Sequence, residues 1–332
     1  MAEIDIFSLE PSKISRDLKG KYLLLYGAPK VGKTSFAVQA PRALICAFEM
    51  GTNALAGTRS LPMLKWTDFK KVISQLRKPQ AKDMYDTVVI DTVSIAYALC
   101  EKYICQREGV DSIRDVAWGQ GWGMLKQEFQ EAFREITMLG FGIIFISHAK
   151  EKPTEARDEE GNAISAMAPD LPTAAYTIVN SLVDLIGYIA VEFDLTTGMS
   201  ERYLYTRQTP TVFAGSRYQY LAPKIKFGYN ELVNAIGDAI DQSVTLDGAQ
   251  VTDHTERVQV TRRPFQDVMT DARNIWISYL EAAKDDEDKD NRVNILNDII
   301  TKIFGKPIKL SQAVPSQQDL VELFIDEAKD LK

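Results

Sequence analysis

The sequence predicts an α/β fold with a mainly parallel central sheet, followed by a small α-helical domain. Apolar runs of strand length alternate with helical patterns through the first half of the chain, as in crossover units that join parallel strands. The first apolar run leads into a glycine-rich loop and then into a helix. Residues 264–332 show helical patterns alone. Together these three observations predict an open sheet first and a helical cluster second.

The predicted strands of the sheet are apolar from end to end, as expected for strands that helices cover on both faces. They comprise residues 21–26, 42–49, 87–91 and 142–148. Helical patterns separate them; Pro41 ends the first helix, and Phe69, Val72 and Ile73 share one face of the second. The helices comprise residues 34–40, 67–78, 93–107 and 122–139, and the loops comprise residues 50–57 and 108–121.

A polar stretch follows the fourth strand. Residues 149–172 carry many charges, so we expect a long loop there, and loops of this length in compact domains are usually functional or mobile. Beyond this loop the pattern predicts further strands, which form an antiparallel extension of the sheet, and then a helix. The extension comprises residues 182–192, 202–207 and 211–220, and the helix comprises residues 230–240.

The chain therefore divides into an α/β core, residues 1–240, a linker, residues 241–263, and a C-terminal helical domain, residues 264–332. The linker is predicted because its sequence is polar and lacks periodicity. The acidic run 285–290 is expected to be a solvated loop between two helices of the C-terminal domain. The three helices of that domain comprise residues 265–283, 292–304 and 317–329.

Charge is unevenly distributed along the chain. The net charge of the 332 residues is −7, and residues 265–332 hold 14 acidic and 9 basic side chains, so the remainder is close to neutral. A negative total argues against a protein that coats nucleic acid through its overall charge, but it allows a local basic groove.

The remaining composition predicts a cytoplasmic protein. The three cysteines lack paired spacing, which indicates reduced thiols, and with only two histidines we expect no histidine-based zinc site. No apolar run reaches membrane-spanning length and the N-terminus has no signal-peptide layout, so we expect no membrane partner.

The glycine-rich loop fits the phosphate-binding pattern G-x-x-x-x-G-K-[ST], between a strand and a helix as that motif requires. Its backbone N–H groups would converge on phosphate oxygens at the positive end of a helix. Lys33 would bind the β- and γ-phosphates of ATP, and the Thr34 hydroxyl would bind Mg²⁺. The alternative is a glycine turn without a ligand. The residues predicted to bind the nucleotide are Gly27, Ala28, Pro29, Lys30, Val31, Gly32, Lys33, Thr34 and Ser35.

Three polar residues end the other predicted strands, at the edge where the sites of open α/β sheets lie. Asp91 is predicted to hold Mg²⁺, or alternatively to cap the following helix. Glu49 is a candidate to orient the attacking water, and its alternative is an exposed loop residue. His148 is a candidate sensor of the γ-phosphate that passes the signal to the loop beyond it, and its alternative is a structural histidine.

Four segments taken together resemble the RecA-like core ATPases, and most of all the phage-encoded members called Sak-type, which are proposed to anneal or pair single-stranded DNA. The resemblance covers roughly residues 18–240. It implies a RecA-like fold, Mg²⁺-dependent ATP hydrolysis, and the cytoplasm of a bacterial host if the chain is phage-encoded. The segments are KYLLLYGAPKVGKTSFA, RALICAFEMGTNAL, TVVIDTVSIAYAL and GIIFISHAKEK.

The resemblance also implies roles for individual residues. Lys33 and Thr34 would bind phosphate and Mg²⁺, Glu49 would be the catalytic glutamate, and Asp91 would be the second carboxylate of the site. His148 stands where recombinases commonly carry a glutamine that couples the γ-phosphate to DNA. The segments 108–121 and 149–172 would correspond to the two DNA-facing loops.

Cationic and aromatic residues in these two segments suit phosphate contact and base stacking. The acidic residues 158–160 oppose this interpretation, and the alternative is a lid or a subunit contact. The candidates are Arg107, Arg114, Trp118 and Trp122 in or beside the first segment and Lys150, Lys152 and Arg157 in the second.

RecA-like sites commonly lie between subunits, and a neighbour then supplies a cation to the γ-phosphate. Of the candidates Arg207, Arg217, Lys224 and Lys226, we favour Arg217 because a nearby glycine would present it on a tight turn. A surface arginine is the alternative.

The predicted function is ATP-dependent binding of single-stranded DNA in recombination or annealing, by a homo-oligomer or filament. The C-terminal helices would pack on one another, or would dock a partner such as a single-strand-binding or annealing protein. A second hypothesis is a nucleotide-dependent adaptor or loader that acts on a protein and never binds DNA. A third is a small-molecule kinase, although no acceptor-binding or lid signature is evident.

Overall fold

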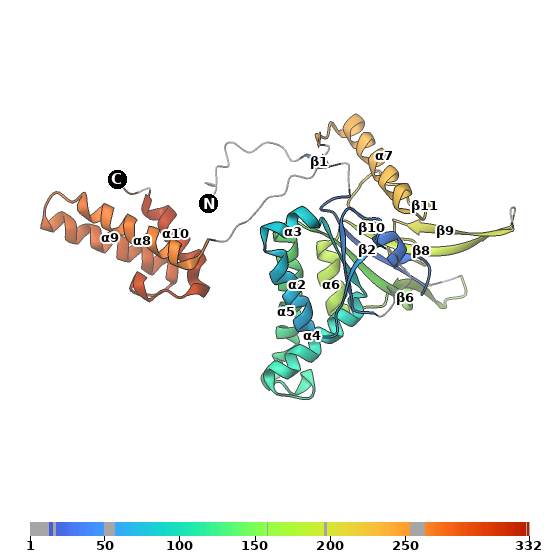
Figure 1. Cartoon of the computed structure of the whole chain (residues 1–332), viewed down its shortest axis with the longest axis horizontal. Coiled ribbons are helices and arrows are strands. Elements are labelled where there is room, and N and C mark those ends of the chain that lie inside the picture. The colour runs from blue at the N-terminus through green and yellow to red at the C-terminus, as the bar shows by residue number, and fades with distance from the viewer. Residues whose placement is uncertain are drawn as a thin grey trace. The chain divides into compact units, whose positions relative to one another are not determined.

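The structure is a computed structural model that describes residues 13–15, 18–49, 57–157, 159–195, 198–252, 263–329 and 331. It contains two compact units, residues 1–259 and residues 260–332 (Figure 1). Three parts of the sequence predictions fall on residues outside this description. They are most of the loop predicted at residues 50–57, residues 253–262 of the predicted linker, and residue 158 of the acidic residues 158–160.

The first unit is built on a large sheet in which the phosphate loop leaves a central strand. The strands that form its main path lie in the order β11, β9, β8, β2, β6, β5, β3, β4. The six strands from β8 to β4 are parallel, and β9 and β11 extend the sheet in antiparallel fashion. Their bounds are β2 (Tyr22–Gly27), β3 (Ala43–Ala47), β4 (Arg59–Pro62), β5 (Thr87–Asp91), β6 (Gly142–Arg157), β8 (Leu185–Asp194), β9 (Met199–Tyr205) and β11 (Lys224–Lys226).

This topology confirms the predicted fold class, an α/β core with a mainly parallel sheet. Strand β6 lies between β2, which carries the phosphate loop, and β5, which ends at Asp91. Short strands complete the unit: β7 (Ala163–Pro169) pairs with β6, β10 (Gly215–Ser216) pairs with β8, and β1 (Ile14–Ser15) pairs with β12 (Val251–Thr252) in a separate two-stranded sheet.

Helices cover both faces of the large sheet (Figure 1). One face packs against α2 (Trp66–Leu76), α4 (Val93–Glu108), α5 (Gly121–Met138) and α6 (Thr173–Leu182). The other face packs against α1 (Lys33–Ala37) and α7 (Tyr229–Asp247), and α3 (Pro79–Met84) precedes β5. Because both faces are buried, the parallel strands are apolar throughout, which is why the sequence pattern located them.

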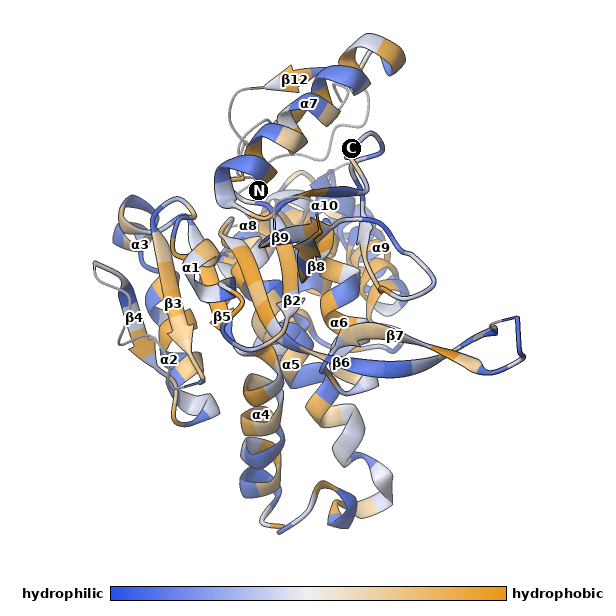
Figure 2. Ribbon diagram, turned by 90° about the vertical axis from the view of Figure 1, so that its right-hand side faces the viewer, coloured by the Kyte–Doolittle hydropathy of each residue, from blue (hydrophilic) through white to orange (hydrophobic). Residues whose placement is uncertain are grey.

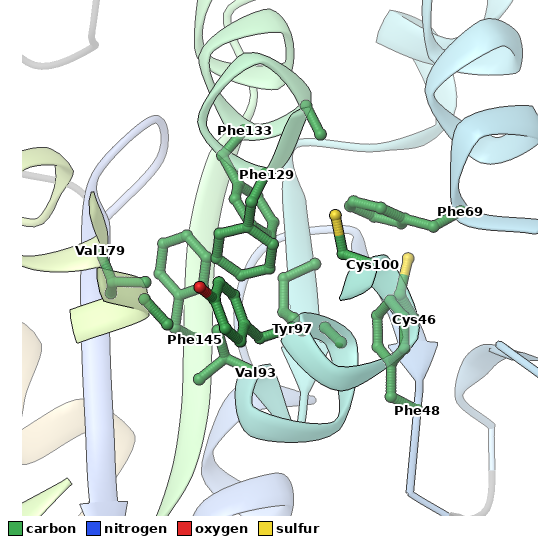
Figure 3. Packing of buried hydrophobic residues seen from close by; sticks show 14 of the residues in the cluster. Cys46, Phe48, Phe69, Val93, Tyr97, Cys100, Phe129, Phe133, Phe145 and Val179 are labelled. Atoms are coloured by element: carbon green, nitrogen blue, oxygen red, sulfur yellow. The ribbon is translucent and has the colours of Figure 1, made fainter. Parts of the chain in front are cut away.

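Aromatic rings fill the core between the sheet and α4 and α5 (Figure 3). Phe133 lies edge-on to both Phe129 and Phe145, at centroid distances of 4.8 and 4.9 Å.

All three cysteines are buried free thiols, and burial raises the pKa of Cys46 to about 12. Thiols buried in this way are packing residues rather than reactive groups.

The prediction of a long loop over residues 149–172 is wrong. Strand β6 continues to Arg157, nine residues beyond His148, and returns as β7 through a turn at Gly161 (φ 86°). We call residues 149–169 the β6–β7 arm; Figure 2 shows it extending away from the sheet with hydrophilic residues along β6. Beyond His148 the described side chains of β6 are exposed or half-buried, so this strand lacks the apolar alternation that identifies a half-buried strand, although Ala166 and Ala168 of β7 are buried.

A second difference concerns residues 211–220, which were predicted as a strand. Only Gly215 and Ser216 form one, because the guanidinium of Arg207 binds the carbonyl oxygens of Ser216, Tyr218 and Gln219 in place of a strand ladder. Helices α3 and α6 were not predicted, and α7 extends to Asp247, into the range predicted as a linker.

The second unit holds the three predicted helices, α8 (Phe265–Glu281), α9 (Asp286–Phe304) and α10 (Gln318–Lys329), around a core of their own. The acidic run 285–290 was predicted as a loop, but it forms the first turn of α9. Asp285 caps that helix, accepting a hydrogen bond from the Asp288 N–H at 2.8 Å, and acidic side chains favour the positive end of a helix. Within the described residues, no helix combines the length and apolarity needed to cross a bilayer.

Candidate nucleotide-binding site

The register of the sheet brings the predicted site residues to one edge. Gly27 lies beside His148 in the pairing of β2 with β6, and Asp91 lies beside Ile146 in the pairing of β5 with β6. Glu49 lies two residues beyond the end of β3, and its backbone N–H donates to the Asp91 carbonyl oxygen at 2.9 Å. Three polar side chains, from β5, β6 and the segment after β3, therefore lie beside the phosphate loop at the carboxyl edge of the sheet.

The phosphate loop requires both of its glycines. Gly32 is the N-cap residue of α1 and has φ 106°, a conformation that residues with a Cβ rarely adopt. A Cβ on Gly27 would lie 2.8 Å from the carbonyl oxygen of Ile189 in β8. The tight loop and its close approach to the sheet leave its N–H groups to converge at the start of α1.

The Lys33 ammonium is folded back onto its own loop. It donates to the carbonyl oxygens of Gly27 at 2.9 Å and Ala28 at 2.7 Å, and the residue is buried. Burial lowers its pKa, although the nearby Asp91 and Glu49 carboxylates act in the opposite direction. A buried cation in the mouth of the loop is suited to bind phosphate oxygens.

Thr34 and Asp91 form a pair suited to a divalent cation. The Thr34 hydroxyl donates to Asp91 Oδ2 at 2.8 Å, and Asp91 is 8% exposed. Burial raises the pKa of Asp91, and the hydrogen bond from Thr34 opposes this rise only in part. Hydroxyl and carboxylate oxygens are the ligands that Mg²⁺ prefers, so the buried pair fits the predicted metal role.

Glu49 and His148 contact each other. His148 Nε2 lies 3.1 Å from Glu49 Oε2, and both side chains are partly exposed. An ionised carboxylate only accepts, so this geometry assigns a proton to Nε2. His148 Nδ1 is buried and has no hydrogen-bond partner in the part of the chain that the structure describes. The candidate sensor therefore holds the candidate catalytic glutamate.

We expect Asp91→Asn to abolish hydrolysis while it stabilises the nucleotide-free protein. The raised pKa means that the folded state disfavours the ionised form, so this carboxylate increasingly destabilises the fold as the pH rises through its folded pKa. Asparagine keeps an acceptor for the Thr34 hydroxyl. Thermal unfolding at neutral pH without Mg²⁺ should show a Tm higher by about 2 °C or more, and a lower Tm would contradict the assigned electrostatics.

The first predicted DNA-facing segment forms the tip between α4 and α5, with two 3₁₀ turns, Ile113–Asp115 and Ala117–Gly119. Trp118 is 94% exposed and has φ 59°, and Trp122 is 47% exposed. Arg107 pairs with Glu108 at 2.8 Å, whereas the backbone N–H of Arg114 bonds to Ser112.

The cations of the second segment lie along the β6–β7 arm. Lys150 pairs with Asp170 at 2.6 Å, and Lys152 Nζ lies 5.9 Å from the centroid of the Tyr176 ring. Arg157 lies at the end of β6, with Nη1 3.5 Å from the carbonyl oxygen of Gly161.

Arg217 lies away from the phosphate loop of its own chain. It binds Asp184 Oδ1 and the Ser181 carbonyl oxygen, each at 3.0 Å, and Asp184 also accepts the N–H of Tyr22 at the start of β2. The other three candidate cations also have partners within the chain. Arg207 binds backbone carbonyl oxygens, Lys224 pairs with Glu192, and Lys226 pairs with Glu201.

The sequence did not predict two side-chain contacts that involve the phosphate loop and the strand before it. Arg202 in β9 donates through Nη1 to the Val31 carbonyl oxygen at 3.1 Å. The buried Tyr26 hydroxyl lies 2.8 Å from the Met167 carbonyl oxygen and 2.6 Å from that of Phe213. No local pattern marks either residue, because each acts on a segment more than 100 positions away in the sequence.

A comparison with protein-family models matches residues 19–218, more than half of the chain, to an AAA domain. The chain belongs to this AAA domain family. With the phosphate loop, this membership confirms the coarse part of the predicted function, a P-loop ATPase. One relative, the SPbeta prophage-derived uncharacterized protein YorG of Bacillus subtilis (strain 168), is 30% identical over 340 residues, covering 99% of this chain and 98% of YorG.

Solved structures with similar folds include the flagellar accessory protein FlaH from Methanocaldococcus jannaschii and the KaiC-like protein PH0186 from Pyrococcus horikoshii OT3. FlaH is 13% identical, with a TM-score of 0.33 over 63% of this chain and 85% of its own. PH0186 is 13% identical, with a TM-score of 0.36 over 64% of this chain and 88% of its own. At these TM-scores neither likeness adds to the assignment.

Proposed function

We propose that this P-loop ATPase binds single-stranded DNA in an ATP-dependent manner, as a homo-oligomer in phage-type recombination or annealing. One observation carries the proposal: a solvent-facing tryptophan, Trp118, projects from the same edge of the sheet as the nucleotide site. Helix α4 starts directly after Asp91 and leads to the tip that bears this residue (Figure 2).

Trp118 has the properties of a stacking residue. A tryptophan normally buries its ring, yet this one is 94% exposed and keeps a left-handed backbone conformation that is costly for a residue with a Cβ. Arg114 and Trp122 lie on the same tip and add charge and a second partly exposed ring. Cations beside exposed aromatic rings are the recurring composition of single-strand binding surfaces.

The nucleotide site would act through the residues already described. Lys33 and the loop N–H groups bind the phosphates, while Thr34 and Asp91 hold Mg²⁺. The bound metal would neutralise negative charge on the phosphate oxygens. Glu49 accepts a hydrogen bond from the attacking water and orients it. Lys33 must leave the carbonyl oxygens of Gly27 and Ala28 to reach the phosphates, so ligand binding changes the contacts of the loop.

The β6–β7 arm is the element that this proposal assigns to the switch. His148 and the arm belong to one continuous strand, so a movement of His148 displaces the start of the arm. The arm is also attached to the phosphate-loop strand, because Tyr26, which precedes Gly27, contacts the Met167 carbonyl oxygen in β7. When the γ-phosphate draws His148 away from Glu49, the start of the arm moves and Glu49 loses its contact with His148 in the same step.

Assembly of several copies is supported by a second projection from the same edge. Strand β8 continues five residues beyond Ile189, which lies level with Gly27, and joins β9. Four apolar side chains near this hairpin end are exposed, and exposed apolar clusters mark protein contacts. They are Val191 (57%), Phe193 (61%), Leu195 (90%) and Met199 (67%). A neighbour docked there could supply a cation such as Arg217 to the nucleotide site.

The similarity to prophage-derived YorG supports a phage context, and with it the cytoplasm of a bacterial host. The Sak-type assignment is part of the proposal and rests on the four sequence segments that resemble that group. In a recombination role, the second unit would bind a partner protein. Its helices bound a groove of about 960 Å³ with the apolar residues Phe265, Met269 and Trp276 in its lining, which is suited to a partner such as a single-strand-binding or annealing protein.

The same groove favours the second candidate function, an adaptor or loader ATPase that acts through a protein partner and never on DNA. The two functions differ in their affinity for DNA itself. An adaptor would show no binding of single-stranded oligonucleotides even at low salt, where phosphate contacts are strongest.

We expect Trp118→Ala to weaken binding of a single-stranded oligonucleotide about tenfold, because one base loses its stacking partner. Trp118→Phe keeps an aromatic face and should retain most of the affinity. The matched control is Leu246→Ala, which removes an exposed apolar side chain (66%) from α7. Fluorescence anisotropy with Mg²⁺ and a non-hydrolysable ATP analogue measures all three, and equal affinities for the alanine and wild-type chains would contradict the role of Trp118.

A further inference from the structure

Arg202 lies against the outside of the phosphate loop. Its Nη1 donates to the Val31 carbonyl oxygen at 3.1 Å, and a Cβ built on Gly32 would lie only 2.6 Å from the same nitrogen. The guanidinium therefore packs directly on the peptide that joins Val31 to Gly32. This contact links β9, in the antiparallel extension of the sheet, to a loop 171 residues earlier in the sequence.

Aromatic packing fixes the guanidinium in this position. Its central carbon lies 5.6 Å from the ring centroid of Phe227, whose backbone N–H donates to the Arg202 carbonyl oxygen at 2.9 Å. The Phe227 ring in turn stacks on Phe36 of α1, with a centroid distance of 5.5 Å and an interplanar angle of 17°. Arg202 and the first helix after the loop thus share one aromatic support.

The charge of Arg202 is unbalanced, unlike that of the cations near it. Lys224 and Lys226 on β11 pair with carboxylates on β8 and β9 at 2.5 and 3.1 Å. Among the described residues, Arg202 forms no ion pair with a carboxylate, so its hydrogen bond to the loop is not shared with an acidic partner. A positive charge left in this way beside a phosphate-binding loop also favours an anionic ligand there.

We propose that Arg202 is a positioning residue of the phosphate loop, which directs the Gly32 N–H toward the bound phosphate. In a planar trans peptide the C=O and the N–H point in opposite directions. By holding the Val31 carbonyl outward, Arg202 turns the Gly32 N–H into the loop. A hydrogen bond to the carbonyl also polarises the amide and strengthens its N–H as a donor. This inference rests on the proposed nucleotide binding and adds a residue that organises it.

The test compares ADP and a non-hydrolysable ATP analogue, in fluorescent form, on the full chain with Mg²⁺. Arg202→Ala should weaken binding of both nucleotides to the same degree, about tenfold, because both place phosphate in the loop. KM for ATP should rise similarly with little change in kcat, and Arg202→Lys should recover part of the affinity. Lys126→Ala, which removes an exposed cation from α5, is the matched control and should bind as the wild type does.

Three results would overturn the inference. Unchanged affinity of Arg202→Ala for both nucleotides would exclude any role in the loop. A larger loss for the ATP analogue than for ADP would show direct contact with the γ-phosphate instead of loop positioning. The third result combines two measurements: Arg202→Ala lowers the Tm of the nucleotide-free chain, and a variant that removes only the Phe227 side chain loses as much nucleotide affinity as Arg202→Ala does. This result would show that Arg202 acts only through packing. Absence of binding by the wild-type chain would refute the proposed nucleotide site itself, and so differs from all three.

Discussion

Lys33→Ala is expected to abolish ATP hydrolysis and to weaken nucleotide binding by about 100-fold or more. The Lys33 ammonium is a buried cation, and it already spans the loop by donating to the carbonyl oxygens of Gly27 and Ala28. These donors transfer to phosphate oxygens when a nucleotide enters. Alanine leaves the loop without this charge, and no other lysine of the motif is buried.

Lys30→Ala is the matched control for this prediction. It removes the same charge from the same loop, but the Lys30 side chain is exposed and therefore contributes little to the ligand. Titration of a fluorescent ATP analogue and a phosphate-release assay measure both variants. If Lys33→Ala and Lys30→Ala retain similar affinity, the loop does not hold phosphate in the proposed way.

Glu49→Gln is expected to lower kcat for ATP hydrolysis by about 100-fold to 1,000-fold while ATP still binds. The amide keeps the size of the side chain and can still accept from His148 Nε2, which lies 3.1 Å from Glu49. It cannot accept a proton from the attacking water. Trapped in the ATP-bound state, this variant should also retain single-stranded DNA for longer than the wild type.

The control for Glu49 is Glu151→Gln, which neutralises an exposed carboxylate on the β6–β7 arm and should hydrolyse ATP at the wild-type rate. His148→Ala separates catalysis from coupling, because it frees Glu49 and disconnects the arm. We expect His148→Ala to hydrolyse ATP without a matching change in DNA affinity. A Glu49→Gln chain with normal kcat would remove Glu49 from the catalytic role.

Much of the fold followed from the sequence because burial leaves a strong pattern. Strands β2, β3 and β5 are apolar on both faces, and Phe69 and its neighbours form a continuous stripe on α2. The part of β6 beyond His148 has no buried side chain among its described residues, and it was predicted wrongly. The β6–β7 arm reads as a polar loop, although its Gly161-Asn162 pair between two runs of similar length was an available hairpin signal.

The other errors arise from single side chains that replace backbone hydrogen bonds. Arg207 satisfies three carbonyl oxygens of a segment that reads as a strand, and Asp285 caps a helix at a place that reads as a charged loop. The Arg207 contacts span nine to twelve residues and leave no local pattern, whereas the Asp285 cap and the acidic first turn after it were a local helix-start signal that the loop prediction overlooked.

The candidate site was predictable residue by residue but not as an assembly. Each of Glu49, Asp91 and His148 was placed at a strand end, which the motif logic of open sheets allows. Their mutual contacts depend on the strand order and register, which one sequence does not specify. Neither the strand-end pattern nor the motif could identify Arg202, because only the fold brings β9 to the phosphate loop.

The central claim, nucleotide-gated binding of single-stranded DNA, is tested most directly by one affinity measurement. A fluorescent single-stranded oligonucleotide is titrated with the full chain in Mg²⁺, with a non-hydrolysable ATP analogue, with ADP or without nucleotide, at low and at physiological salt. The account predicts at least about tenfold tighter binding with the ATP analogue than with ADP, and weaker binding as salt rises. Absence of binding in every nucleotide state at low salt would contradict it and leave the adaptor function in its place.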